Sequence, residues 1–129
     1  MRVFKTKPFE RFARKEGISA MSLCEAVARA DDGLIDANLG GGLIKQRVAR
    51  QGQGRSGGYR IIIVYRSGQT AIFIHGFAKS DKDNIDAREL RELQKAATVF
   101  LALSDAELDK AVKGRRLIEV RCDDQEIPQ

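Results

Sequence analysis

Two adjacent runs of β-branched and aromatic residues constrain this chain more than any other feature. The runs are 59–66 (YRIIIVYR) and 69–78 (QTAIFIHGFA), and only Ser67 and Gly68 separate them. Such residues favour strands, and a two-residue connection that contains glycine favours a hairpin. The sequence therefore predicts an antiparallel strand pair.

The length of the turn sets the expected register of this hairpin. With two residues in the turn, Arg66 pairs with Gln69, and Arg60 then pairs with His75. The same parity continues to Lys79, so this face ends in a cationic cluster. A turn one residue longer would shift the pairing. The opposite face is apolar and needs a cover of helices; its residues are Ile61, Ile63, Tyr65, Thr70, Ile72 and Ile74.

The remaining elements follow from caps and periodicity. Pro8 and Gly17 bracket a short helix, and Ser19 caps a second one that ends near Gly33. We expect a buried stripe on the second helix, formed by Leu23, Ala26, Val27 and Ala30. Capping patterns predict helices after Asp86 and Ser104, and Leu90, Leu93, Ala97 and Phe100 recur on one face of the first of these. Strands are expected at 3–5, 43–50 and 117–121.

These elements predict one domain over residues 1–129, with an α+β architecture and a mostly antiparallel sheet. We expect residues from about 122 onward to form a flexible tail. The two cysteines, Cys24 and Cys122, are far apart and lack metal-ligand spacing, so we expect reduced packing residues. The longest apolar run spans 61–65, too short to cross a membrane, and a cytoplasmic location is expected.

The charge of +5 is concentrated in one part of the chain. Residues 37–80 contain no acid, and they carry seven bases: Lys45, Arg47, Arg50, Arg55, Arg60, Arg66 and Lys79. This is the pattern of a polyanion site, and an ordinary solvated basic face is the alternative. Arg60 is expected to bind an external phosphate, unless it pairs with Asp81 or Asp36. His75 is either a functional group or a satisfied sheet histidine.

The glycines at 52, 54 and 57 match the dinucleotide-binding pattern GxGxxG, but a strand follows them instead of a helix. The pattern also needs an acidic residue about 20 positions further on to bind the ribose, and the first acid after these glycines is Asp81. We therefore expect no nucleotide cofactor and no metal. The segment is either a flexible basic loop that closes on a phosphate backbone or an ordinary connection.

The segments GRSGGYRIIIVYR (54–66), AIFIHGFAKSDKDNI (71–85), GLIKQRVAR (42–50) and LSDAELDKAV (103–112) resemble the RelE/HigB-like toxins of bacterial type II toxin-antitoxin systems. The resemblance covers nearly the whole chain. It implies the compact RelE-like fold. This fold has a twisted sheet, N-terminal helices that cover one face of the sheet, and further helices toward the C-terminus. Such toxins are ribosome-dependent endoribonucleases that cleave mRNA on the 70S ribosome. A cognate antitoxin, often a helix-turn-helix protein, neutralises them.

The resemblance also implies roles for individual residues. Arg60 matches the strand arginine that stabilises the phosphate in the transition state, and Lys79 would be a second phosphate ligand or an acid. His75 is the candidate general acid or base. The expected RNA- or ribosome-binding residues are Lys45, Arg47, Arg50, Arg55 and Lys82.

The chain departs from the best-known RelE pattern because no tyrosine follows Tyr65. The identity of the general base therefore stays open. ParE-like relatives use the same fold to inhibit DNA gyrase without cutting RNA, and this is the main alternative. An inactive phosphate-binding member is a third possibility.

Overall fold

The computed structural model describes residues 1–50, 57–80 and 84–122. The elements in chain order are β1 (Arg2–Thr6), α1 (Lys7–Glu16), α2 (Ala20–Asp31), β2 (Ala37–Gly40), β3 (Leu43–Val48), β4 (Tyr59–Arg66), β5 (Thr70–Ala78), α3 (Ala87–Leu101), α4 (Asp105–Lys113) and β6 (Leu117–Val120). The described strands form one six-stranded sheet in the order β2-β3-β4-β5-β1-β6. Only the β1–β5 pair is parallel, which confirms the predicted α+β class with a mostly antiparallel sheet.

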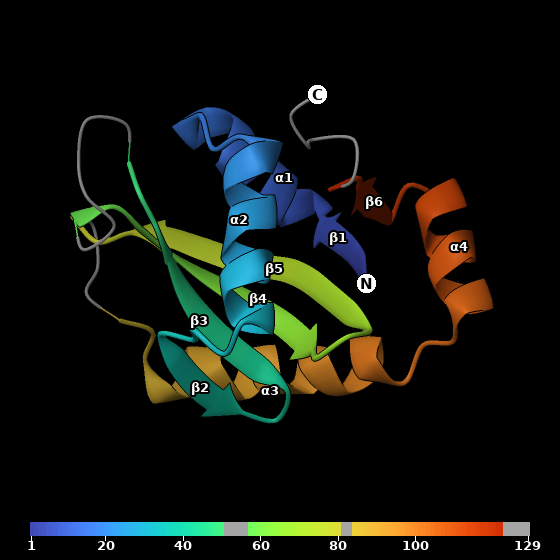
Figure 1. The fold of residues 1–129 in the computed structure, drawn as a ribbon. Coiled ribbons are helices and arrows are strands. Elements are labelled where there is room, and N and C mark those ends of the chain that lie inside the picture. Colours follow the sequence, from blue (N-terminus) through green and yellow to red (C-terminus); the bar gives the residue numbers. More distant parts are fainter. Residues whose placement is uncertain (51–56, 81–83, 123–129) are drawn as a thin grey trace.

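Helices lie on both sides of the sheet (Figure 1), and an apolar cluster lies on each side. On one side, α1 and α2 cover β-strand residues such as Ile61, Ile63 and Phe73; we call this the α1/α2 face. On the other side, α3 and α4 pack over Ile62, Val64 and others; we call this the α3 face. The buried residues of the apolar cluster on the α3 face are Phe4, Leu43, Ile62, Val64, Ile72, Ala97, Leu108, Ala111 and Leu117.

The helices begin and end where the sequence signals place them. Thr6 accepts from Phe9 N at the start of α1, and Gly17 ends that helix with a φ of 72°. The predicted stripe of α2 is buried at all four positions. Both capping boxes form, at Asp86 and at Ser104, because each side chain accepts from a backbone N–H that the first helical turn leaves unpaired.

The predicted register of the β4–β5 hairpin is wrong. Arg66 pairs with Thr70 instead of Gln69, so the connection has one residue more than expected. Gln69 N donates to Arg66 O, but its carbonyl accepts from Arg2 N on β1. The shift turns Phe73 toward the α1/α2 face and Ile72 toward the α3 face, the reverse of the expectation for Ile72.

A β-bulge then shifts the same strand pair a second time. Ile63 pairs with Phe73, whereas Ile62 pairs with His75, so Ile74 is the extra residue. Because each one-residue shift exchanges the two faces, the second one restores the expected parity. Arg60 and His75 therefore do share a face, although the cross-strand partner of Arg60 is Phe77 and not His75.

The edge strand β2 has no counterpart in the sequence prediction. Its residues, ANLG, include none of the β-branched or aromatic types that favour strands. It forms because Gly40, Gly41 and Gly42 all take positive φ and reverse the chain into β3. The pairing of Ala37 with Lys45 fixes this edge against β3.

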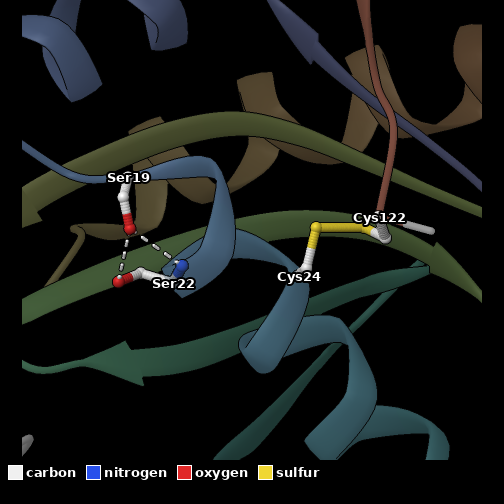
Figure 2. The surroundings of a disulfide bond; sticks show 4 residues. All are labelled: Ser19, Ser22, Cys24 and Cys122. Atoms are coloured by element: carbon white, nitrogen blue, oxygen red, sulfur yellow. Dashed lines mark hydrogen bonds between the residues drawn. A yellow bond between two sulfur atoms is a disulfide. The ribbon is translucent and has the colours of Figure 1, made fainter. Parts of the chain in front are cut away.

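The expectation of two reduced cysteines is also wrong. Figure 2 shows a disulfide between Cys24 on α2 and Cys122 just after β6, with Cα atoms 5.5 Å apart. The two residues are 98 positions apart in the sequence. They meet because β6 pairs with β1 and carries Val120 into the α1/α2 cluster. Spacing along the chain does not reveal such a contact.

Candidate active site

The acid-free window of the sequence folds into β2, β3, β4 and β5, which are adjacent in the sheet. Side chains alternate between the two faces of a strand. Lys45 and Arg47 on β3, and Arg60 on β4, therefore point to the α3 face, since their neighbours Ile44, Val48 and Ile61 pack against α1 and α2. Three bases of the window thus meet on one face.

Arg60 lies at the centre of this group. Its exposed fraction is only 5%, and its cross-strand neighbours are Arg47 on β3 and Phe77 on β5. A guanidinium binds phosphate through two parallel hydrogen bonds, so an arginine at this place is suited to bind a phosphate.

His75 lies on the same face, across from Ile62 and diagonal to Arg60. Its Nε2 is 3.8 Å from Oε2 of Glu89, a residue of the first turn of α3. The ring is also close to Phe77, with 6.0 Å between the ring centroids. A cavity of about 240 Å³ opens between His75 and α3; it is lined by His75, Asp86, Arg88, Glu89, Glu92 and Leu93.

Two lysines flank the group. Lys45 is half-buried, and its Nζ donates to Oδ1 of Asn84 at 3.3 Å, which joins β3 to the segment before α3. Lys79 is exposed just beyond β5, and its backbone N donates to the carbonyl of Gly58. Gly58 directly precedes β4, so Lys79 lies at the same end of the hairpin as Arg60.

Arg50 lies elsewhere. Its guanidinium carbon is 5.7 Å from the ring centroid of Tyr59, whose side chain belongs to the α1/α2 cluster. The Tyr59 hydroxyl donates to the carboxylate of Glu16 at 3.1 Å. Burial, and then this carboxylate, raises the pKa of Tyr59. The contacts of Arg50 thus tie it to the opposite face, and Arg55 and Lys82 lie outside the described residues.

The sequence offers two acids, Asp36 and Asp81, as possible partners of Arg60, and the structure describes only Asp36. Asp36 accepts from the backbone N of Arg47 at 2.6 Å and lies 3.6 Å from Nη1 of Arg29. Asp36 is therefore engaged at the β2 edge of the sheet. Asp81 lies outside the described residues, as do Gly52 and Gly54 of the rejected GxGxxG pattern.

Sequence reasoning missed two residues of this site, Asn84 and Glu89. Asn84 carries no sequence signal beyond its place in the DNI segment. Glu89 is recognisable only as a capping residue, because its approach to His75 depends on how α3 docks on the sheet.

The chemistry available at this site is binding of a phosphate and movement of a proton. A buried guanidinium, a lysine amine and an imidazole beside a carboxylate are the groups that such chemistry uses. Within residues 1–50, 57–80 and 84–122, no group of three or more His, Cys, Asp or Glu is placed to hold a metal ion. The helices of this described part are too short or too polar to span a membrane.

Comparison with known proteins gives one family and no curated relative. A search of curated proteins finds no match. The family model described as the RelE toxin of the RelE/RelB toxin-antitoxin system matches residues 1–120. That match covers every helix and strand of the structure. The chain therefore belongs to the RelE toxin family, which makes it the toxin of a toxin-antitoxin system with a cognate antitoxin as its partner.

Proposed function

We propose that this RelE toxin is a ribosome-dependent endoribonuclease, an mRNA interferase that cuts translated mRNA and so inhibits translation and growth. Membership of the family supports this proposal, since RelE toxins are known as translation-dependent endoribonucleases. The partners in this proposal are the 70S ribosome with its mRNA, and a helix-turn-helix antitoxin.

One observation carries the proposal: the convergence of Arg60, Arg47 and His75 on the α3 face, next to the start of α3. Arg60 is nearly buried, so a phosphate bound to it would be largely removed from water. Electrostatic stabilisation is strongest in such surroundings. Lys45 and Arg47, nearer the sheet edge, suit contacts to the backbone of mRNA or ribosomal RNA.

The proposed reaction needs no group beyond the RNA and the protein. The 2′-hydroxyl of a ribose loses its proton to a base at the site, and the 2′-oxygen forms a bond to the adjacent phosphorus. The bond from phosphorus to the 5′-oxygen breaks, and that oxygen takes a proton. A 2′,3′-cyclic phosphate and a 5′-hydroxyl result. Arg60 stabilises the added charge on the non-bridging phosphate oxygens, Lys79 is a second phosphate ligand, and His75 performs one of the two proton transfers.

Brief expression of the toxin, followed by mapping of transcript 5′ ends, tests the proposal. We expect cuts within translated regions, in phase with codons and carrying 5′-hydroxyls. Intact transcripts together with accumulated gyrase-cleaved DNA would contradict it and identify a ParE-like inhibitor. Intact transcripts and intact DNA would also contradict it and identify an inactive phosphate-binding member.

A further inference from the structure

We infer that Glu89 is the positioning residue of His75, and that it keeps the imidazole protonated so that His75 is the general acid of the cleavage. This inference rests on the proposed function. It assigns to His75 the second proton transfer, in which the ring gives its proton to the 5′-oxygen as the phosphorus–oxygen bond breaks. The ring ends neutral, and the cut strand ends in a 5′-hydroxyl.

The carboxylate of Glu89 contacts the cap of α3 through one oxygen and His75 through the other. Its Oε1 accepts from the backbone N of Asp86 at 3.4 Å, as half of the capping box of α3. Its Oε2 lies 3.8 Å from Nε2 of His75. In return, Asp86 Oδ1 accepts from Glu89 N at 2.8 Å. The helix cap therefore fixes the direction of the carboxylate, and that direction is toward the ring.

A carboxylate at this distance favours the charged form of a histidine. An unperturbed imidazole has a pKa of about 6.5 and is mostly neutral at pH 7, so it is a poor proton donor there. Stabilising the imidazolium raises the fraction of toxin that carries the proton. This is the form that a general acid needs.

The other charged groups around His75 have opposing effects on the protonation of its ring. From α3, Asp86, Arg88 and Glu92 line the same cavity. From the sheet, Arg60 is diagonal on β4, and Lys45 on β3 is in the same row through Ile62. The sheet cations disfavour the charged ring, and the carboxylates favour it. Among these groups of the described residues, Glu89 has an ion-pair contact with the ring.

The chain contains its own matched control. The capping box of α4 has the same construction, and Glu107 Oε1 accepts from Ser104 N at 2.9 Å. His75 is the only histidine of the sequence, so Glu107 has no imidazole beside it. Glutamine preserves a capping box. Glu89→Gln and Glu107→Gln thus keep the two caps and remove one carboxylate charge each.

The direct test is an NMR titration of the single histidine in the full-length toxin, in the wild type and in both variants. We expect Glu89→Gln to lower the pKa of His75 by about half a pH unit or more, and Glu107→Gln to leave it unchanged. An equal pKa in all three proteins would overturn the inference. Matching thermal midpoints of the two variants would show that the caps survive.

A second measurement separates this inference from the proposed function. In a purified translation system, the alkaline limb of the pH–rate profile of mRNA cleavage should move to lower pH in Glu89→Gln and stay in place in Glu107→Gln. A profile that does not move while the pKa of His75 falls would overturn the assignment of His75 as the acid. Absence of cleavage by the wild type would refute the proposed function, whereas the titration would still test the contact of Glu89 with His75.

Discussion

The two faces of the sheet differ in the side chains that they carry. The α1/α2 face is closed along its length by an apolar cluster in which Phe9, Leu23 and Phe73 are almost completely buried. The α3 face has such a cluster beneath α3 and α4, but its part near the start of α3 carries Arg60 and His75. The α1/α2 face is thus closed mainly by apolar packing, whereas the α3 face also brings charged groups together.

The polar ends of the α1/α2 face are also closed. Tyr59 donates to Glu16 on α1, and Tyr65 donates to Asp31 on α2 at 2.5 Å. Burial is the main cause of the raised pKa of both tyrosines. These two acids, Glu16 and Asp31, are thus each bound by a neutral hydroxyl, in contrast to the imidazole and carboxylate pair on the α3 face.

The largest expected effect is on the closed face. Phe73→Ala removes a fully buried ring that lies 5.3 Å from the ring centroid of Phe9. We expect the free energy of unfolding to fall by about 3–5 kcal/mol, measured by urea denaturation. Val99→Ala on α3, at a residue that is 63% exposed, should change it by less than about 0.5 kcal/mol. Similar losses in the two variants would contradict the burial of Phe73 in the closed face.

The disulfide adds a further stabilisation to the α1/α2 face. Cys122→Ala opens a loop whose ends are 98 residues apart, so we expect the oxidised protein to lose about 2–5 kcal/mol. Thermal unfolding with and without reductant measures this. Reductant should lower the stability of the wild type to that of the variant, and a wild type insensitive to reductant would refute the expectation.

Two glutamines provide a third comparison between the faces. Gln46 is completely buried, donates to Ala26 O and Leu34 O, and accepts from Asp36 N. Gln46→Leu removes these three hydrogen bonds and should cost about 1–3 kcal/mol. Gln94→Leu on α3 breaks only the side-chain bond to Leu39 O and should cost about 1 kcal/mol or less. Urea denaturation measures both losses of stability. A larger loss for Gln94→Leu than for Gln46→Leu would contradict this expectation.

The smallest expected effect concerns pH. The Lys5 ammonium, 2.6 Å from Glu10, is the main cause of the lowered pKa of that carboxyl. Because the pKa is lower in the folded state, the pair stabilises the protein above the ordinary value of 4.5. This contribution disappears as pH falls through the folded pKa, and it amounts to at most about 1 kcal/mol. Unfolding curves from neutral to acidic pH should therefore decline less steeply for Glu10→Gln than for the wild type.

Local signals predicted much of this fold, and non-local contacts account for what they missed. Caps and periodicity located all four described helices, because both depend on residues within one or two turns. The β4–β5 register depends on one extra turn residue and on the bulge at Ile74, and neither leaves a clear mark in the sequence. The shared face of Arg60 and His75 was predicted correctly only because these two shifts cancel.

We propose the basic end of the α3 face as the site of RNA cleavage. The most direct test is the rate of mRNA cleavage on ribosomes in a purified translation system, with Arg60→Ala compared with Arg66→Ala. Both arginines are on β4 and on the same face, but Arg66 is exposed at the turn end. We predict a loss of about 100- to 1000-fold for Arg60→Ala, and a rate close to wild type for Arg66→Ala. A folded Arg60→Ala variant that cleaves as fast as the wild type would contradict the claim.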